Sequence, residues 1–280
     1  ITGKNGSGTI FFSYCNLRCV YCQNYDISFN CIGEEITVNR LVDIMLELQD
    51  MGALNINLVT PSHYIPLIRD SIIIAKDCGL TIPIIYNTSG YDSVESLKLL
   101  EGLIDIYLPD FKYYNDKLGK YSNISNYFET ASLALKEMYR QVGKLRYNKD
   151  GILVKGMIVR HLVLPNNYDD SKKIIKYLYD NYKDNIIISI MNQYTIIRKL
   201  EYSELNDKVD EKEKYEKSRL PESGYMTVAE YEEKSRGKSK KEISAKILDK
   251  AEMPEDKNMV YIPQKKFKLV KYNDPVGSPE

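Results

Sequence analysis

An alternation of short apolar runs with amphipathic segments fills the first two hundred residues, and it constrains the fold more than any other feature of the sequence. The apolar runs are rich in Ile, Leu and Val and lie between turn residues, which is typical of buried strands. The segments between them carry apolar residues at helical spacing. Leu41, Ile44 and Leu48 are one such set, behind a candidate N-cap at Thr37 or Asn39. Strands that are apolar on both faces and alternate with helices indicate a parallel sheet with the helices packed outside it.

We count about six strand–helix units, against the eight of a complete (βα)8 barrel. The expected strands span residues 9–14, 53–60, 82–86, 103–108, 152–164 and 186–190. Within the α/β class, six units fit a partial TIM-like barrel, and they fit a doubly wound open sheet equally well. In either fold, functional residues gather at the carboxyl ends of the strands, so polar residues there are the first candidates for a site.

The composition changes near Leu205 and divides the chain into two predicted regions. Residues 206–250 are crowded with Glu, Lys, Asp and Arg and include few large apolar residues. We therefore expect residues 1–205 to form the folded core and residues 206–280 to form a charged, partly helical C-terminal extension of unknown role. A partner-docking tail or partial disorder are alternatives for this extension. Its segment 267–270 is a candidate edge strand or adhesive tail.

The charge balance disfavours two classes of partner. Lys and Arg together number 39, as do Asp and Glu, so the net charge at neutral pH is zero and no global basic field favours nucleic acid. No apolar run is long enough to span a bilayer, and no signal peptide precedes the first expected strand, so we expect no membrane association. With few cysteines and no export signal, a cytoplasmic location is expected. The start at Ile1 rather than Met indicates a fragment or a processed product.

Three cysteines, Cys15, Cys19 and Cys22, follow the first expected strand with the spacing C-x3-C-x2-C. Cysteine thiolates are the usual ligands of iron–sulfur clusters, and three of them on one short loop suit such a cluster. A [4Fe–4S] cube has four irons, so three cysteines leave one iron open to an external ligand. The spacing therefore predicts a cluster with an open coordination position.

Zinc and disulfides are the competing interpretations of these cysteines. A structural zinc site needs four protein ligands, and only Cys31, Cys78, His63 or His161 could supply the fourth. A disulfide framework fits less well, because 5 cysteines in 280 residues is an odd and sparse count. From the spacing alone, the zinc site stays open beside the cluster.

The stretch 8–24, which contains the three cysteines, resembles the cluster loop of radical S-adenosylmethionine (SAM) enzymes. It is most similar to the PflX-like branch, which is related to pyruvate formate-lyase activating enzyme, and Tyr21 occupies the aromatic position directly before the third cysteine of that pattern. The resemblance spans residues 3–215 and implies a partial (βα)6 barrel with helices outside. It also implies two cofactors, a [4Fe–4S] cluster held by the three cysteines and SAM bound to the open iron through its amino and carboxylate groups. Reductive cleavage of SAM would then give a 5′-deoxyadenosyl radical.

The same resemblance extends to the polar residues at the strand ends. Thr60 lies where many family members carry a Gly-Gly-Glu segment that binds the SAM amino group. Residues 87–91 resemble an Asp-Thr-Asn-Gly-Phe segment of the activating enzymes, with Asn87 in place of the acid, and residues 110–112 resemble their Asp-Leu-Lys. The implied cofactor contacts are Tyr21, Thr60, Asn87, Ser89, Asp110, Lys112 and Arg160.

Within that set, the resemblance implies specific partners for SAM. Lys112 and Arg160 are the expected partners of its carboxylate, and Asp110 is the expected polar or ribose contact. A structural alternative is an ion pair between Asp110 and Arg160 that closes the rim of the barrel.

Four further polar residues are candidate substrate contacts: His63, His161, Asn192 and Gln193. His63 lies on a strand-end loop, where binding residues are common. His161 lies inside an apolar run, so the alternative for it is a hydrogen-bonded core histidine.

The resemblance implies an oxidoreductase of the activating-enzyme type, although the sequence does not identify its substrate. The expected partner is a glycyl-radical protein, or another protein substrate. The sequence has no cysteine-rich ferredoxin insert, so an external electron donor such as a flavodoxin or a ferredoxin-like protein is implied, and an oxygen-sensitive cluster implies an anaerobic host. The alternative function is a non-catalytic iron–sulfur or zinc protein that uses the cysteine loop for electron transfer or structure.

Overall fold

The computed structural model describes residues 1, 5–30, 32–207 and 267–269 of the 280-residue chain. Cys31 lies outside the described residues. So does the predicted C-terminal extension, apart from residues 206–207 and 267–269.

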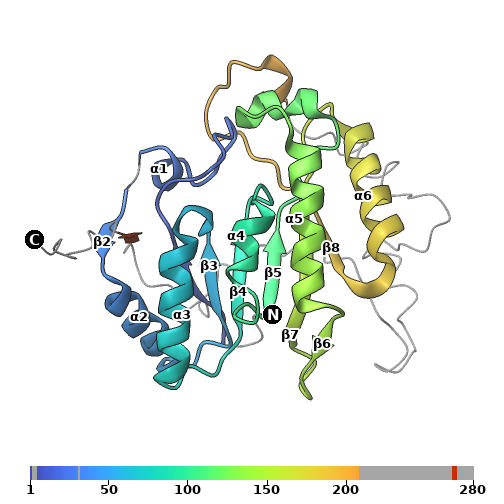
Figure 1. Cartoon of the computed structure of the whole chain (residues 1–280). Helices are drawn as coiled ribbons and strands as arrows, with labels where there is room; N and C mark the ends of the chain where they lie inside the picture. The colour runs from blue at the N-terminus through green and yellow to red at the C-terminus, as the bar shows by residue number, and fades with distance from the viewer. Residues whose placement is uncertain (2–4, 31, 208–266, 270–280) are drawn as a thin grey trace, which may run out of the picture.

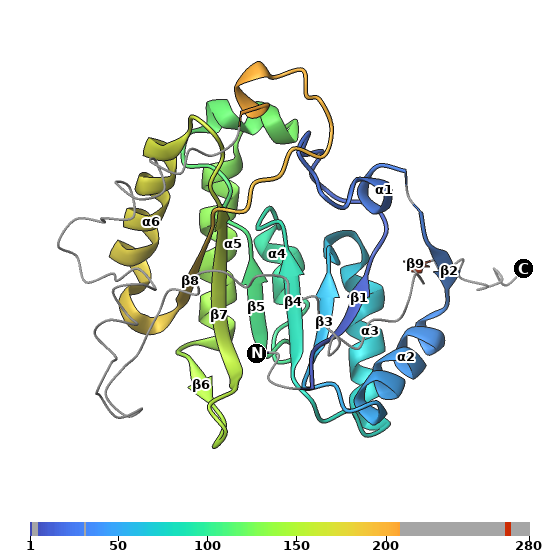
Figure 2. The ribbon, with the colours of Figure 1, turned by 180° about the vertical axis from the view of Figure 1, so that it is seen from behind.

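Six parallel strands form the centre of the fold (Figure 2). They are β1 (Gly8–Phe11), β3 (Ile56–Val59), β4 (Ile84–Thr88), β5 (Ile106–Pro109), β7 (Leu153–Leu162) and β8 (Ile187–Met191). Each strand pairs in parallel with the next of these six along the chain. The spatial order therefore never reverses, whereas a doubly wound sheet requires a reversal at its switch point. The prediction of an α/β partial TIM-like barrel is confirmed, and the doubly wound alternative is wrong.

Helices cover one face of this sheet, as the two opposite views show (Figures 1 and 2). The α-helices are α1 (Tyr25–Ser28), α2 (Val38–Asp50), α3 (Ile65–Asp77), α4 (Val94–Lys98), α5 (Tyr127–Val142) and α6 (Tyr168–Tyr182). Four 3-10 turns accompany them, η1 (Ser62–Tyr64), η2 (Asp116–Ser122), η3 (Lys183–Asn185) and η4 (Ser203–Leu205). Right-handed connections between parallel strands place such helices outside a barrel wall.

Helix α2 illustrates how local sequence sets these elements. The side chain of Thr37 accepts a hydrogen bond from the backbone N–H of Arg40, so of the two candidate caps Thr37 is the N-cap. The helix stops before Gly52, whose φ of +88° lies in the left-handed region that favours glycine.

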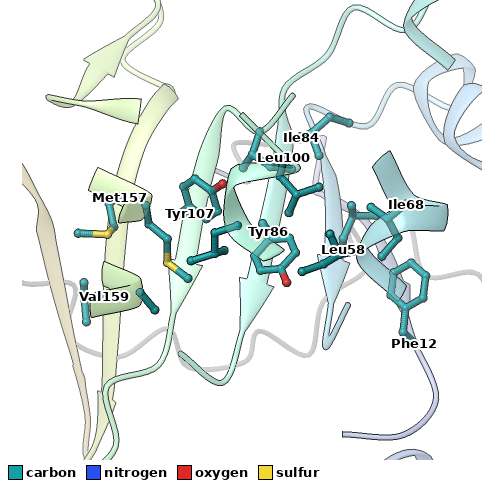
Figure 3. Close-up of a cluster of buried hydrophobic side chains, with 14 of the residues drawn as sticks. Phe12, Leu58, Ile68, Ile84, Tyr86, Leu100, Tyr107, Met157 and Val159 are labelled. Atoms are coloured by element: carbon teal, nitrogen blue, oxygen red, sulfur yellow. The ribbon is translucent and has the colours of Figure 1, made fainter. Parts of the chain in front are cut away.

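The main core lies between the sheet and the helices, and Figure 3 shows part of it. Tyr86 and Tyr107 face this layer with their rings 5.8 Å apart, and both are fully buried. Burying a large apolar side chain stabilises a fold by about 1.5–3 kcal/mol, so this layer dominates stability. A smaller cluster made only of strand residues, Ile85, Ile106, Leu108, Leu153, Ile158 and Ile187, lies on the opposite, inner face. Successive strand residues thus alternate between the two faces, which decides which polar side chains reach the inside of the barrel.

Three short strands complete the described structure. Strand β6 (Arg146–Tyr147) pairs antiparallel with β7, and β2 (Glu34–Ile36) pairs in parallel with β9 (Phe267–Leu269). Within segment 267–270, the candidate edge strand or adhesive tail, Phe267–Leu269 forms β9 in a two-stranded sheet apart from the central one. In the described part of the chain, no helix is long and apolar enough to cross a membrane.

Candidate active site

The three predicted ligand cysteines lie on the loop that leaves β1 and enters α1. Cys19 is buried, and Cys15 and Cys22 are partly buried. The Sγ of Cys15 accepts from the backbone N–H of Leu17 at 3.4 Å, and the thiol of Cys22 donates to Ser28 Oγ at 3.6 Å. All three are free thiols, as is Cys78, so the disulfide alternative is wrong for the described cysteines.

Distant segments clamp this loop in place. The backbone N–H groups of Arg18 and Val20 donate to the carbonyl oxygens of Ser122 (3.2 Å) and Tyr121 (2.8 Å), at the end of η2. On the other side, Arg198 donates from Nη2 to the carbonyl oxygen of Val20 at 2.7 Å. The loop is therefore held from both sides at the residues next to Cys19.

The donor set fits a cluster better than a single ion. Among the described residues, no three His, Cys, Asp or Glu side chains are arranged to hold one metal ion, so the zinc alternative gains no support. A cube differs, because each of its cysteine ligands binds a different iron and the three sulfurs need not meet at one point. Burial raises the pKa of Cys15 to about 12 and also raises that of Cys19. These thiols become good ligands only beside a positive metal centre, which deprotonates a coordinating thiol.

Four of the predicted cofactor contacts form one hydrogen-bonded network at the ends of β4, β5 and β7. Asp110 accepts from Arg160 Nε at 2.9 Å and from Lys112 Nζ at 2.7 Å. Arg160 also donates from Nη2 to Asn87 Oδ1 at 2.8 Å. Asp110 and Arg160 therefore form the ion pair of the structural alternative.

This network keeps its charges. Burial acts to raise the pKa of Asp110, but the positive charges of Arg160 and Lys112 outweigh it and the pKa of this carboxyl is lowered. Burial acts to lower the pKa of Lys112, but the Asp110 carboxylate outweighs it and the pKa is raised well above its usual range. Two cations and one carboxylate leave one positive charge, which is suited to binding an anion.

The end of β4 joins the cysteine loop to this network. The strand continues through Asn87 and Thr88, two residues beyond the end of the expected strand 82–86. Ser89 donates from Oγ to Asn16 Oδ1 at 3.1 Å, inside the cysteine loop. Tyr127 then donates from its hydroxyl toward the carbonyl oxygens of Ser89 (2.9 Å) and Asp110 (3.0 Å).

The Thr60 segment lies beside a buried carboxylate. Thr60 has a φ of 59° and donates its backbone N–H to the carbonyl oxygen of Asn87 at 2.9 Å. Two residues later, Ser62 lies 3.2 Å from the hydroxyl of Thr88, which in turn bonds to Asp92. Asp92 is only 4% exposed and also accepts from Tyr86, and burial raises its pKa.

Tyr21 is buried beside the cysteines rather than open to a ligand on all sides. Its hydroxyl lies 2.7 Å from that of Tyr113, and its ring meets the ring of Tyr194 edge-on at 6.2 Å. These contacts fix the position of Tyr21 directly before the third cysteine of the loop.

The four predicted substrate contacts fall into different surroundings. His161 is 2% exposed, and its ring nitrogens lie 2.7 Å from the carbonyl oxygen of Phe111 and 2.8 Å from Ser171 Oγ on α6. It therefore packs between β7 and α6, on the other face of the strand from Arg160. His161 thus has the burial and the hydrogen bonds of the core-histidine alternative, and its burial gives no support to a substrate contact.

The other three are accessible. His63 is exposed, with Nε2 3.3 Å from the carbonyl oxygen of Ser13 at the start of the cysteine loop. Asn192 and Gln193 are exposed and directly follow β8. None of the three belongs to the Asp110 network.

Several residues of this site carry no signal in the sequence. Ser122, Tyr113, Tyr127 and Arg198 contact the cysteine loop or the Asp110 network from positions far along the chain. Asp92 is the exception, because it follows the end of β4 by four residues and the strand-end rule could have included it.

Comparisons with known proteins agree with this geometry. Residues 9–178 match the family described as Radical SAM superfamily. Two proteins of Methanocaldococcus jannaschii are similar in sequence. One, "Uncharacterized protein MJ0674", is 31% identical over 234 residues, which cover 75% of this chain and 62% of that protein. The other, "Uncharacterized protein MJ0808", is 29% identical over 175 residues, which cover 59% and 46% respectively. The chain thus spans less than two thirds of the length of either relative.

A solved structure shares the fold. The crystal structure of Streptococcus suis SuiB bound to S-adenosylmethionine superposes with a TM-score of 0.54 and 13% identity, covering 88% of this chain and 51% of that one. Sequence identity this low supports a shared fold and nothing more, and the shared fold is the partial barrel described above.

The cofactors of the matched family, a [4Fe–4S] cluster and SAM, fit the free thiols of the loop and the single positive charge beside it. From the match over residues 9–178 and the three-cysteine loop, this chain belongs to the radical SAM superfamily.

Proposed function

We propose that this chain is an enzyme that binds a [4Fe–4S] cluster through Cys15, Cys19 and Cys22 and cleaves SAM reductively. The observation that carries the proposal is the joining of two features by hydrogen bonds. The loop with three free thiols is connected through Asn16 and Ser89 to the end of β4, directly beside the Asp110 network. When bound, the cluster supplies the electron that cleaves the sulfonium of SAM.

The residues of this chain orient SAM in that proposal. Arg160 and Lys112 bind its carboxylate by charge-assisted hydrogen bonds, which are the strong kind. Asp110 holds both cations in position from one carboxylate, so neither has to be ordered when SAM binds. Lys112 also lies close enough to Cys19 to act on it electrostatically, which supports SAM and the cluster lying side by side.

We assign the finer role of an activase in the PflX-like branch, acting on a glycyl-radical protein or another protein substrate in an anaerobic cytoplasm. Its support is the sequence of residues 87–91 and 110–112, which resemble the corresponding activating-enzyme segments. In the structure both segments lie at the same end of the sheet, where SAM is proposed to bind.

An external electron donor is part of this proposal. A stack of four side chains borders the cysteine loop: the Arg18 guanidinium lies 5.0 Å from the ring of Phe29, that ring lies 4.3 Å from the ring of Tyr25, and the Arg198 guanidinium lies 3.8 Å from Tyr25. Two cations held beside the cluster suit an acidic donor such as a flavodoxin or a ferredoxin-like protein.

The experiment is anaerobic reconstitution of the chain with iron and sulfide, followed by an assay for 5′-deoxyadenosine formed from SAM and a reductant. We expect reductant-dependent product from the parent chain and from Cys78→Ala, an exposed cysteine outside the loop. Cys19→Ala should give none. Product formation by Cys19→Ala would overturn the proposal, and a stable cluster without any product would leave an electron-transfer protein instead.

A further inference from the structure

A chain of buried hydroxyl groups ends on the sulfur of the middle cysteine. Ser122 Oγ lies 2.9 Å from Cys19 Sγ, the hydroxyl of Tyr113 lies 2.6 Å from Ser122 Oγ, and the hydroxyl of Tyr21 lies 2.7 Å from that of Tyr113. These side chains are 8% exposed or less, so water does not compete for their hydrogen bonds. Among the hydrogen bonds of the described residues, neither Cys15 nor Cys22 has a contact as short as the one between Cys19 and Ser122.

Local structure fixes the position of Ser122. It ends η2, and the next residue, Asn123, closes the turn in the left-handed conformation with a φ of 57°. The carbonyl oxygen of Ser122 accepts from the backbone N–H of Arg18, so its main chain holds Arg18 while its side chain contacts Cys19. The ring of Tyr113 is packed edge-on against Tyr127 at 5.3 Å, which limits its motion.

The Cys19 sulfur, at the end of this row of hydroxyl groups, sets the direction of every hydrogen bond in the row. A thiolate bound to iron can only accept a hydrogen bond, so the single proton of Ser122 must point at Cys19. The oxygen of Ser122 is then free to accept from Tyr113, and the oxygen of Tyr113 to accept from Tyr21. Hydrogen bonds aligned in one direction polarise each other, so the two tyrosines strengthen the one that reaches the sulfur.

We propose that Ser122 is a positioning residue for the cluster: its hydroxyl donates to the Cys19 sulfur and thereby raises the reduction potential of the cluster. Tyr113 and Tyr21 orient this hydroxyl. The inference rests on the proposed function, since it requires the cluster. Its physical basis is that reduction adds negative charge to the cluster and its sulfurs, and a donor aimed at a ligand sulfur stabilises that charge. The hydroxyl of Tyr21 therefore serves the cluster, apart from any contact of its ring with SAM.

The test is a redox titration of the reconstituted holoprotein, in which the electron paramagnetic resonance (EPR) signal of the reduced cluster is monitored. Ser122→Ala should shift the midpoint potential to a more negative value, and Tyr113→Phe, which keeps the ring, should shift it in the same direction by less. Ser122→Thr keeps the hydroxyl and should restore the parent potential. Ser71→Ala is the matched control, because Ser71 is equally buried but donates to the carbonyl oxygen of Leu67 on α3.

The outcomes separate the two proposals. If the parent chain assembles no cluster, the proposed function fails. If the parent assembles one and Ser122→Ala titrates at the same potential, this inference alone fails. If Ser122→Ala assembles too little cluster to titrate, Tyr113→Phe tests the inference instead. An unchanged midpoint potential in Tyr113→Phe then contradicts the proposed effect of these hydrogen bonds on the cluster.

Discussion

Arg198 donates a hydrogen bond from Nη2 to the carbonyl oxygen of Val20 at 2.7 Å, across 178 positions of the chain. Val20 lies between two of the cluster cysteines, and the same guanidinium stacks on the ring of Tyr25 at 3.8 Å. The segment after β8 thus returns to the loop after β1 and holds it against η2. The first and last parallel strands of the barrel are connected through the cluster loop.

Removing this contact should loosen the cluster loop. A hydrogen bond to a charged group contributes about 1.5–3 kcal/mol, and the cation–π contact adds about 0.5–2 kcal/mol. We expect Arg198→Ala to bind less iron and sulfide on reconstitution than the parent chain. Its exposed neighbour provides the control Lys199→Ala, which should match the parent. Equal iron content in Arg198→Ala and the parent would show that the contact does not support the loop.

Gly90 and Gly102 offer a matched pair, because both have a φ of +78°. A Cβ at Gly90 would overlap the carbonyl oxygen of Asp110, whereas a Cβ at Gly102 would have no atom within 4 Å. Gly102→Ala should therefore cost only the left-handed penalty of about 1–2 kcal/mol in unfolding free energy. Gly90→Ala should cost clearly more and weaken SAM binding, since it displaces the end of β5. Urea unfolding measures both variants, and equal losses would contradict the tight approach of the two strand ends.

His161 should make stability fall in mild acid. Burial lowers its pKa to about 4, from an ordinary value of 6.5, so between these values the unfolded chain binds a proton that the folded chain does not. This stabilising contribution is full above pH 6.5 and is lost as the pH falls toward 4, with a limit of about 3 kcal/mol. His161→Gln should lose most of the change in unfolding free energy between pH 7 and pH 5, measured in urea. Burial lowers the pKa of His63 in the same direction, but its side chain is exposed, so His63→Gln should remove a smaller part of the change than His161→Gln. If the unfolding free energy of His161→Gln changes with pH as that of the parent chain does, His161 is not the cause of the change.

Arg160 is the expected anchor for the SAM carboxylate. Arg160→Gln leaves Asp110 and Lys112 as a neutral pair and removes a charged donor worth about 1.5–3 kcal/mol, or about 10- to 150-fold in affinity. We expect the dissociation constant of SAM for the reconstituted protein to rise by that factor. Arg140→Gln is the control, since Arg140 forms ion pairs with Glu101 and Glu137 on the helical surface. Unaltered SAM affinity in Arg160→Gln would place the carboxylate elsewhere.

Hydrophobic pattern was enough to predict the order of strands and helices, but their ends depended on contacts. The run over residues 103–108 predicts the fourth of the six expected strands, and the structure places this strand, β5, at Ile106–Pro109. Asn87 and Thr88 are polar and lie beyond the expected strand 82–86, yet they are the last residues of β4. They continue the strand because neighbouring strands and Asp92 satisfy their hydrogen-bonding groups.

The strand-end rule brought together Asn87, Asp110, Lys112 and Arg160, since carboxyl ends of parallel strands share one edge. The same rule also includes His161. Because side chains alternate along a strand, Arg160 and His161 must lie on opposite faces of β7, so the two cannot both face the site. Ser122 could not be found this way, because its contact with Cys19 spans 103 positions and forms only when η2 folds against the loop.

The proposed chemistry requires an iron without a protein ligand, to which SAM binds directly. Pulsed electron–nuclear double resonance on the reduced, reconstituted chain measures this, using SAM labelled with 17O in its carboxylate and 15N in its amino group. Direct binding of SAM to the open iron predicts hyperfine coupling from both labels to the cluster. A reduced cluster that forms normally and shows coupling to neither label would contradict it.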